Sequence, residues 1–330
     1  MAVLIWLYVL GVLAWWVVLR FGSDRVWPAT ILLFAPRWPM LLPLLILLPL
    51  AIAWRRVLVL VLIGIAILIA WPIMGFCTGV LPTRPADSRA DLRILTLNSH
   101  FAGLNAEALH AVIERERPDV IVLQEWWIHN LHPMLGDDRR YPYQVNNDLA
   151  LLASRYPVRP MLALKAVPTA EDGIFYGYTV DLPGRSIQFF NVHLASPHNS
   201  LREIIQGGNF GINRLRQNAM ARWNEAMRLR DLAKLAGSDV ILAGDFNLPP
   251  DSPIFRSAFG DLSDAFSTAG FGYGWTYYHH TAVRIDHIVT GDGWQCERCW
   301  VGPDVGSPHR PLLVDLKRIS TFSGAAEGPR

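Results

Sequence analysis

The first 83 residues of this 330-residue chain are much more hydrophobic than the rest. They form three long apolar runs, at residues 2–19, 40–54 and 57–74, and contain only six charged side chains. A helix that crosses a bilayer needs about 20 mostly apolar residues, so the first and last runs have nearly the required length. The middle run is shorter and contains Pro43 and Pro49, so it either spans with a kink or re-enters. This pattern predicts a membrane segment with two or three transmembrane helices.

The predicted membrane segment determines the expected organisation of the whole chain. A cleaved signal peptide would need a basic start and a single short apolar core, and residues 1–83 have neither. We therefore expect a multi-pass integral membrane protein with a linker at 84–91, one folded domain at 92–318 and a disordered tail at 319–330. If there are three spans, the numbers of arginines on the two sides of the membrane favour a cytoplasmic domain. If the middle run only re-enters, these numbers no longer apply. The side of the membrane on which the domain lies stays open.

The charge balance of the folded domain argues against an extensive nucleic-acid surface. Five of the 30 basic and one of the 28 acidic residues lie in residues 1–83, which leaves a net charge of about −2 for residues 84–330. Proteins that wrap duplex nucleic acid usually carry a basic stripe, because phosphate contacts supply much of their affinity. No strong basic patch of this kind is evident in the sequence. No pattern indicates the oligomeric state.

The three cysteines do not complete a metal-binding motif. Cys77 lies near the end of the membrane segment, and Cys296 and Cys299 form one C-x-x-C without the second pair that a zinc site needs. Two alternatives remain for this pair: a local disulfide, or two ordinary thiols in a strand or turn.

The domain at residues 92–318 is predicted to contain more strands than helices. Strands are expected at 92–98, 119–123, 149–155, 175–182, 186–194, 240–243, 284–289 and 311–316, and helices after Asn105, at 213–235 and after Pro250. The strands around Pro183 and Gly184 form a predicted hairpin. A simple βαβ winding would alternate strands with helices, and this order does not. We predict an α/β (α+β) fold, a four-layer sandwich of two packed, mainly antiparallel β-sheets flanked by helices.

The inner face of the long helix at 213–235 is predicted from its apolar residues. They are Leu215, Met220, Trp223, Met227 and Leu232. We expect these side chains to pack against the sheet.

Polar side chains follow or end several of the predicted strands. They are Asn98, Glu125, His193, Asp245 with Asn247, Asp286 and His309. Side chains alternate between the two faces of a strand, so Asp245 and Asn247 should leave the 240–243 run on the same face. An Asx turn is the alternative explanation for Gly-Asp-x-Asn considered alone. The recurrence of the pattern favours convergence of all these groups on one rim of the fold.

The order of these motifs resembles the endonuclease/exonuclease/phosphatase superfamily over roughly residues 90–318. The superfamily comprises metal-dependent phosphoesterases, including pancreatic deoxyribonuclease, abasic-site endonucleases and neutral sphingomyelinases. The motifs that carry the resemblance are Leu97-Asn98, Leu123-Gln124-Glu125, Ser154-Arg155-Tyr156-Pro157, Asn191-Val192-His193-Leu194, Gly244-Asp245-Phe246-Asn247, Arg284-Ile285-Asp286-His287 and Ser307-Pro308-His309-Arg310-Pro311. Each motif is short, and the specificity comes from finding seven of them in family order.

The resemblance implies a divalent cation in the site. Phosphoester hydrolysis requires such an ion to neutralise phosphate oxygens, and hard Mg²⁺ prefers one or two carboxylates with water completing its coordination. We expect one Mg²⁺ or Mn²⁺ ion with Glu125 as its main ligand and Asn98 adding a neutral oxygen. A solvated strand-end carboxylate is the alternative for Glu125, and a turn-forming amide is the alternative for Asn98.

The resemblance also implies roles for the remaining groups. His309 is expected to act as a base or as a phosphate-contacting imidazole, with Asp286 fixing its tautomer. Asp245 is expected to orient or activate the attacking water, Asn247 to hold that water or a phosphate oxygen, and His193 to donate to phosphate oxygens. A buried structural histidine is the alternative for both histidines.

One position departs from the family pattern. The family usually has Ser-Asp-His in the last motif, and Pro308 stands in place of the acid here. A missing carboxylate favours one cation held mainly by Glu125 over a two-metal site. Asp304 would replace the acid only if its loop folded back.

Together these observations predict a membrane-anchored, metal-dependent hydrolase of a phosphodiester or phosphomonoester. Arg155 is the candidate contact to the substrate phosphate, with an exposed structural arginine as the alternative. Proximity to the lipid bilayer and the near-neutral charge favour a lipid-like substrate over nucleic acid. A surface or cytoplasmic nuclease of the same superfamily is the first alternative. A catalytically silent domain that binds a lipid or a partner is the second, motivated by Pro308.

Overall fold

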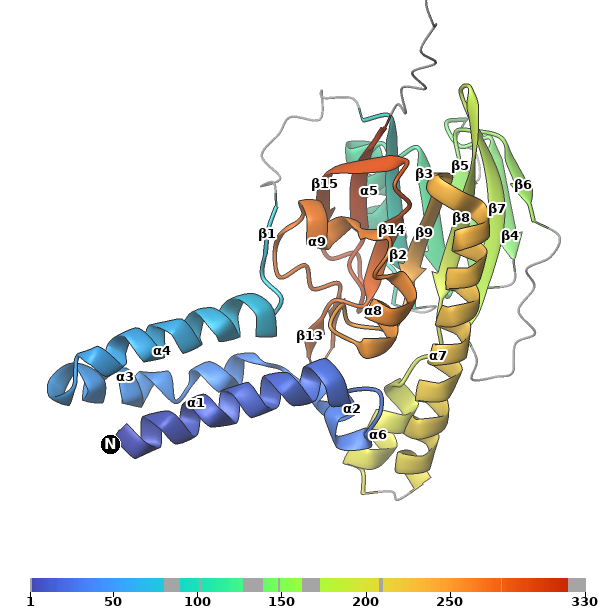
Figure 1. The fold of residues 1–330 in the computed structure, drawn as a ribbon. Helices are drawn as coiled ribbons and strands as arrows, with labels where there is room; N and C mark the ends of the chain where they lie inside the picture. Colours follow the sequence, from blue (N-terminus) through green and yellow to red (C-terminus); the bar gives the residue numbers. More distant parts are fainter. Residues whose placement is uncertain are drawn as a thin grey trace, which may run out of the picture.

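The computed structural model describes residues 2–79, 90–100, 103–126, 139–147, 149–161, 173–207, 210–279 and 281–319 of the chain. The linker predicted at 84–91 and the tail predicted at 319–330 lie almost entirely outside these residues. The described residues form an N-terminal group of helices and a larger α/β unit beside it (Figure 1).

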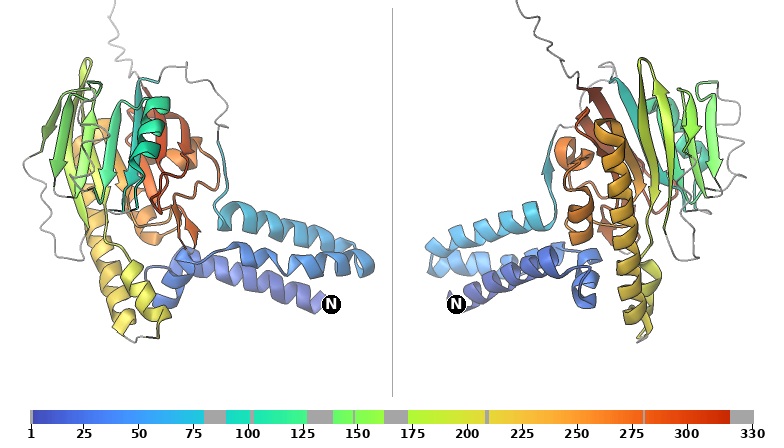
Figure 2. Two further views of the ribbon diagram at one scale, coloured as in Figure 1. Left: turned by 180° about the vertical axis from the view of Figure 1, so that it is seen from behind. Right: turned by 45° about the vertical axis from the view of Figure 1, so that its right-hand side comes forward.

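The N-terminal helices form an arm that projects from the α/β unit (Figures 1 and 2). The elements are α1 (Ala2–Val17) with the π-helical turn η1 (Val18–Gly22), α2 (Trp27–Phe34), η2 (Trp38–Leu41), α3 (Leu44–Trp54), α4 (Val57–Leu68) and η3 (Ile69–Ile73). Helices α1, α3 and α4 lie side by side and share an apolar core that includes Ile5, Leu47 and Leu62. Helix α2 lies where the arm meets the α/β unit, near α6 (His198–Ile205) and α7 (Phe210–Ala236).

One helix in the described part of the chain is long and apolar enough to cross a bilayer. It is formed by α1 and η1, has 21 residues, and has a mean hydropathy of 2.4 over its most apolar window. The helices Trp27–Phe34 and Trp38–Trp54 reach the required length only together, and they are bent by 83°. Pro36 and Pro39 lie at this bend, where proline cannot continue a helix. The helix Val57–Ile73 is too short. The prediction of a multi-pass integral membrane protein is therefore wrong, because within the described residues one helix is long enough to span and the other apolar helices are bent or too short.

Two six-stranded sheets form the centre of the α/β unit. The strand order in the first sheet is β15 (Trp294–Val301), β16 (Leu312–Arg318), β2 (Leu92–Asn98), β3 (Val120–Gln124), β5 (Ala150–Ser154) and β4 (Tyr143–Asn147). The order in the second sheet is β10 (Ser263–Asp264), β14 (Asp286–Thr290), β9 (Val240–Asp245), β8 (Arg185–His193), β7 (Ile174–Leu182) and β6 (Val158–Pro160). Within these described strands, β2 pairs with β3 and β8 with β9 in parallel, and the other neighbours are antiparallel. The prediction of mainly antiparallel sheets is confirmed.

The two sheets pack face to face because the residues of each strand alternate between two buried environments. In β2, Ile94 faces the second sheet, whereas Leu95 packs on the side of α5 (Ala106–Glu116). In β9, Ala243 faces the first sheet, whereas Leu242 packs on the side of α7 and α8 (Pro253–Phe259). The layers are therefore α5, the first sheet, the second sheet, and α7 with α8, which confirms the four-layer sandwich. Burial on both faces explains why the central strands are continuous apolar runs.

Several short elements complete the described fold. They are η5 (Gly237–Asp239), α9 (Ala265–Ala269), the pair β1 (Cys77–Thr78) with β11 (Phe271–Gly272), and the pair β12 (Tyr277–Tyr278) with β13 (Ala282–Val283). The pairing of β1 with β11 ties the end of the arm to the α/β unit. Cys296 and Cys299 are separate, buried thiols in β15, so the second of the two alternatives for the C-x-x-C pair is confirmed.

The predicted inner face of helix α7 is confirmed in part, because Leu215 is buried and Met227 and Leu232 pack against the core. Its buried residues are Gly211, Leu215, Ala219, Arg222, Ala226, Leu229 and Ala233. Met220 and Trp223, which were predicted to be inside, are 67% and 43% exposed. The buried face combines two leucines with small residues and one arginine, so the large apolar residues alone reveal only part of it.

Candidate functional site

Four of the predicted site residues lie at the same end of the two sheets, in the space between them. They are Asn98, His193, Asp245 and Asp286. In β9 the inward-facing Ile241 and Ala243 are followed by Asp245, because strand residues two apart share a face. The strand register places His193 opposite Asp245 in the parallel ladder and Asp286 opposite Asp245 in the antiparallel ladder. Residues from four distant parts of the chain therefore meet at one edge.

A buried polar contact joins the two sheets behind this edge. Gln124 Nε2 donates a hydrogen bond to Asn191 Oδ1 at 2.7 Å, and Asn191 Nδ2 donates to the carbonyl oxygens of Leu123 and Leu151 at 3.2 Å. Both amides are almost fully buried. Both residues belong to the motifs of the family resemblance, and no role was predicted for either of them. Their position indicates that they hold the sheets at a fixed separation where the site residues meet.

The turn from Gly244 to Asn247 holds Asp245 at the end of β9. Gly244 has a φ of 149°, and a Cβ atom there would lie 1.9 Å from the carbonyl oxygen of Val192 in β8. Asp245 Oδ1 accepts a hydrogen bond from the backbone N–H of Asn247 at 2.9 Å, which is an Asx turn. Asn247 has a φ of 49°, and its Nδ2 donates to the carbonyl oxygen of Leu194 at 2.9 Å. The Asx turn and the polar cluster are therefore not alternatives, because Asp245 forms the turn through Oδ1 and directs Oδ2 at the cluster.

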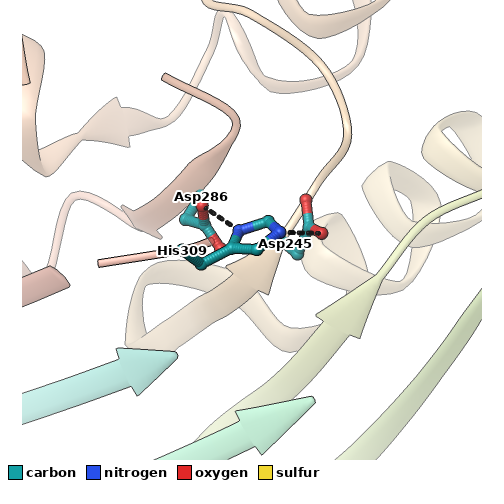
Figure 3. A group of neighbouring side chains, drawn as sticks. All are labelled: Asp245, Asp286 and His309. Carbon is teal, nitrogen blue, oxygen red and sulfur yellow. Dashed lines mark hydrogen bonds and ion pairs between the residues drawn. The ribbon is translucent and has the colours of Figure 1, made fainter. Parts of the chain in front are cut away.

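His309 lies between two buried carboxylates (Figure 3). Its Nδ1 donates to Asp286 Oδ2 at 2.9 Å, and its Nε2 lies 3.8 Å from Asp245 Oδ2. The backbone N–H of Asp286 donates to Thr276 Oγ1 at 3.0 Å. The ring of Tyr277 packs edge-on against the imidazole, with centroids 4.9 Å apart. Asp286 thus orients the imidazole so that Nε2 points at Asp245.

Glu125 and His193 belong to the same cluster as Asp245. Asn98 Nδ2 donates to Glu125 Oε1 and to Asp245 Oδ2, both at 3.0 Å. His193 Nε2 lies 3.5 Å from Glu125 Oε1 and 3.9 Å from Asp245 Oδ2. Asn98 Oδ1 accepts from the backbone N–H of His100 at 3.0 Å, so the amide presents its NH₂ group rather than its oxygen to the carboxylates. Ligation of a metal by Asn98 would require a half-turn of this amide.

Burial and charge shift the pKa values of two groups in the cluster. Burial raises the pKa of Asp245, and the nearby Asp286 adds to this shift, while His309, His193 and the hydrogen bond from Asn98 oppose it. Burial by itself lowers the pKa of His309, but Asp286, Asp245 and Glu125 outweigh it and raise that pKa to about 9. The carboxylates therefore favour a positive charge at this edge of the sheets.

The donor atoms suit a divalent cation. A carboxylate oxygen of Asp245 and one of Asp286 lie within 4.8 Å of each other and of a ring nitrogen of His309, so the two carboxylates can face one cation while His309 stays protonated. Within the described residues, the buried Oδ1 of Asp286 has no hydrogen-bond partner. Hard divalent cations prefer carboxylate oxygens, and Glu125 brings a third carboxylate to the same edge. The set of donors thus fits the metal implied by the sequence.

The cluster opens into a cleft of about 1440 Å³. Glu125, Asp245, Asn247 and His309 line it from the sheets. Helix α2 and the residues after it contribute the apolar side chains of Ile31, Phe34, Ala35 and Pro36, and α6 contributes Leu201 and Ile205. The N-terminal segment is therefore part of the cleft wall.

Arg155 is not brought together with the other predicted site residues. Strand β5 runs antiparallel to β3, so Ala150 pairs with Gln124 near the cluster while Ser154 pairs with Val120 at the opposite end. Arg155 forms an ion pair with Asp119, with 2.9 Å between Nη1 and Oδ1. It lines a separate cleft at that end of the first sheet.

Pro308 lies beside the cluster, and the described residues around it provide no substitute carboxylate. Its carbonyl oxygen accepts a hydrogen bond from the backbone N–H of Tyr278 at 2.7 Å. Asp304 forms an ion pair with Arg310 and accepts from the backbone N–H of Gly306 at 2.8 Å. The side chain of Asp304 is 66% exposed, so it does not turn inward to take the place of the missing acid.

Comparison with known proteins agrees with this geometry. The sequence model of the endonuclease/exonuclease/phosphatase family matches residues 95–309, about two thirds of the chain. The chain belongs to this family. Members of the endonuclease/exonuclease/phosphatase family are divalent-metal-dependent phosphoesterases, in agreement with the carboxylate and imidazole groups gathered here. No curated protein matches the sequence.

Solved structures share the fold at low sequence identity. D. rerio TDP2 complexed with a single-strand DNA product has a TM-score of 0.53 at 17% identity, and the match covers 68% of this chain and 98% of that chain. Truncated C. elegans TDP2 has a TM-score of 0.51 at 14% identity, with 68% and 97% covered. A family protein from Beutenbergia cavernae has a TM-score of 0.50 at 18% identity, with 70% and 72% covered. These likenesses concern the fold of the α/β unit.

Proposed function

We propose that this protein is a divalent-metal-dependent phosphoester hydrolase with its active site at the edge where β2, β8, β9 and β14 meet. The observation that carries this proposal is the position of His309, which lies between Asp286 and Asp245 with Glu125 nearby in the same cleft. Three neighbouring carboxylates, two of them buried, repel one another unless positive charge offsets them, so a purely structural role does not explain why they are gathered with two imidazoles.

Glu125 is the proposed main ligand of one Mg²⁺ or Mn²⁺ ion, with Asn98 and the neighbouring carboxylates completing the site. When bound, the ion neutralises charge on the phosphate oxygens and stabilises the leaving oxygen. We propose one ion rather than two because Pro308 replaces a carboxylate.

The remaining residues bind the phosphate and move protons. The raised pKa of Asp245 makes it a stronger base than an ordinary carboxylate, so it accepts the proton of the attacking water. His309 is protonated at neutral pH and donates from Nε2 to a phosphate oxygen, while Asp286 holds the ring in place. Asn247 positions Asp245 through the Asx turn, and His193 donates to a second phosphate oxygen.

The cleft wall favours a substrate with an apolar part. Ile31, Phe34 and the two residues after it face the same cleft as the catalytic groups. A phosphoester whose apolar chain lies along this wall would gain roughly 25 cal/mol for each Å² of apolar surface buried. A membrane-proximal, lipid-like phosphoester is therefore our proposed substrate class, and α1 with η1 is the proposed single anchor.

A nuclease is the second candidate function. D. rerio TDP2, which shares the fold, was crystallised with a single-strand DNA product. The net charge of about −2 for residues 84–330 argues against it, since phosphate contacts need a basic surface.

Hydrolysis of bis-p-nitrophenyl phosphate by the full-length protein in detergent tests the reaction class. We expect turnover with Mg²⁺ or Mn²⁺ that EDTA removes, and a loss of roughly 100-fold or more in Glu125→Ala and His309→Ala. Arg155→Ala is the matched control, because Arg155 lies at the opposite end of the first sheet and should be neutral. Metal-dependent turnover that survives both site substitutions would refute the proposed site.

Substrate profiling separates the two candidate functions. Mixed micelles of a phospholipid should be hydrolysed faster than plasmid DNA or single-strand DNA. Ile31→Ser should slow hydrolysis of the lipid while leaving the small nitrophenyl ester unaffected, because only the lipid reaches the apolar wall. Rapid cleavage of DNA without attack on any lipid would favour the nuclease.

A further inference from the structure

The turn between η1 and α2 contacts α7 and the loop after β9 in the α/β unit. Ser23 and Asp24 form this turn, and both side chains are buried. Asp24 has a φ of 63°, a left-handed conformation that aspartate and asparagine tolerate better than most residues. Its backbone N–H donates to Thr30 Oγ1 at 3.1 Å, so the turn is held by the first residues of α2.

Asp24 makes its side-chain contacts with the α/β unit. Its Oδ1 lies 3.2 Å from Nη2 of Arg222 in the middle of α7, and its Oδ2 accepts from Ser252 Oγ. Arg222 is fully buried, and within the described residues it forms an ion pair with Asp24. The nearby Glu225 already accepts backbone hydrogen bonds from Gly173 and Ala195 at 2.7 and 2.9 Å. A fully buried guanidinium needs a counter-charge, and Asp24 of the N-terminal segment supplies the larger part of it, with Glu225 adding to it.

Arg222 in turn contacts the proposed active site. Its Nη1 donates to the backbone carbonyl oxygen of Asn247 at 3.1 Å, and its Nε donates to Asn218 Oδ1 at 3.0 Å. Asn247 has its own left-handed φ of 49° and bonds Asp245 through both its backbone and its side chain. A continuous chain of buried polar contacts therefore runs from Asp24 through Arg222 and Asn247 to Asp245.

A second set of contacts holds the same loop from the arm. Arg37 Nη1 lies 2.8 Å from Asp251 Oδ2, and the same nitrogen donates to the carbonyl oxygen of Ile73. Arg256 Nη2 donates to the carbonyl oxygen of Arg20. The segment from Asn247 to Arg256 is thus fixed to the N-terminal helices at four places, through Arg222, Asp251, Ser252 and Arg256.

We propose that Asp24 is a positioning residue for the active site, acting through Arg222 on Asn247. The N-terminal segment then does more than attach the protein to a membrane or line the cleft. It completes the support of the loop that holds Asp245 in line with His309. The proposal rests on the proposed function, because that function identifies this edge as an active site. The contacts of Asp24 and Arg222 do not depend on it.

The substitution Asp24→Asn tests the proposal with little change in shape. Asparagine keeps the left-handed backbone conformation and the size of the side chain but removes the charge that pairs with Arg222. We expect kcat for bis-p-nitrophenyl phosphate to fall about 10- to 100-fold with little change in KM, since small misplacement of catalytic groups has effects of this size. In an Arg222→Met background the same change should lower kcat much less, because the guanidinium through which Asp24 acts on the carbonyl oxygen of Asn247 is already absent.

Asp315→Asn is the matched control. Asp315 belongs to another buried ion pair, with Arg93, at the end of β2 opposite to Asn98. Its loss should lower the melting temperature without lowering kcat of the folded protein. A variant that is only less stable therefore shows a lower melting temperature with unchanged kcat, whereas misplacement of the active-site loop lowers kcat.

Hydrogen–deuterium exchange provides a readout that does not depend on activity. Asp24→Asn should speed exchange of the amides at 245–248 and 251–252, and Asp315→Asn should not. Equal exchange rates in wild type and Asp24→Asn, or equal acceleration by both substitutions, would overturn the proposal. If the wild-type protein lacked metal-dependent turnover, the proposed function would fail while the exchange comparison would still decide the role of Asp24.

Discussion

The Nδ1 atom of His309 lies 2.9 Å from Oδ2 of Asp286, and both side chains are buried. Asp286 begins β14, whereas His309 lies in the loop before β16, which belongs to the other sheet. This hydrogen bond therefore connects the two sheets at the active-site edge. It also combines with Asp245 to raise the pKa of His309 to about 9.

Asp286→Asn should lower turnover of bis-p-nitrophenyl phosphate about 100-fold or more. The substitution removes the negative charge that orients the His309 ring and keeps it protonated. The pKa of His309 should fall from about 9 toward its ordinary value of 6.5. Nuclear magnetic resonance of the imidazole signals in the metal-free protein measures this change, with His309→Gln to assign the signal. An unchanged titration in Asp286→Asn would contradict the electrostatic explanation.

Glu125→Gln should abolish stabilisation of the protein by divalent cations. A cation that binds only the folded protein raises its stability by RT ln(1 + [L]/Kd), about 2.7 kcal/mol at 100 times the Kd. Thermal unfolding of wild type should therefore shift upward with Mg²⁺ or Mn²⁺ relative to EDTA. The glutamine variant should unfold at the same temperature in both conditions. An equal upward shift in both proteins would show that Glu125 is not the main ligand.

Gly244→Ala should destabilise the protein by about 3 kcal/mol or more and disturb Asp245, because the new Cβ would lie 1.9 Å from the carbonyl oxygen of Val192. Gly184→Ala is the control, since Gly184 also has a positive φ, of 73°, but has no atom within 4 Å of the new Cβ. It should cost only about 1 kcal/mol. Chemical unfolding of both variants in detergent measures the difference. A similar loss of unfolding free energy in the two variants would mean that β8 and β9 move apart enough to accommodate the new methyl group.

Asp264→Asn should make the protein less stable at neutral pH and less sensitive to acid. Burial raises the pKa of Asp264, but the ion pair with Arg284 and the contact with His287 outweigh it and hold that pKa well below its ordinary value of 3.8. A lowered folded-state pKa stabilises the protein above pH 3.8, and this contribution is lost as the pH falls below that value. We expect a deficit of about 3 kcal/mol at pH 7 that shrinks toward pH 2. Unfolding at a series of pH values measures it, and a constant deficit would contradict the assignment.

Much of the fold follows from local sequence patterns. The run Leu92–Asn98 forms β2 with the predicted bounds, and Asn105 caps α5 by accepting a hydrogen bond from the backbone N–H of Ala108 at 3.0 Å. The hairpin around Gly184 also forms where predicted, with Leu182 opposite Arg185. These features depend on strand alternation, capping and turn chemistry, which act between residues close together in the chain.

Other positions depend on contacts that no local pattern specifies. Arg155 ends a strand as Asp245 does, but β5 runs antiparallel to β3, so Arg155 lies at the opposite end of the sheet. Arg222 occupies the buried face of α7 because Asp24, nearly 200 positions earlier, provides its counter-charge. The apolar runs after α1 have the composition of membrane spans, yet they are bent or too short.

The sequence alone therefore determined which groups were available, namely the strands, their polar ends and the order of the family motifs. Only the tertiary structure decided which of these groups meet, because strand direction and register place a strand end at one edge or the other. It also decided that the N-terminal segment supports the site. A buried charge can be placed only where the fold brings a partner to it, and in this protein the partner of Arg222 comes from the turn before α2.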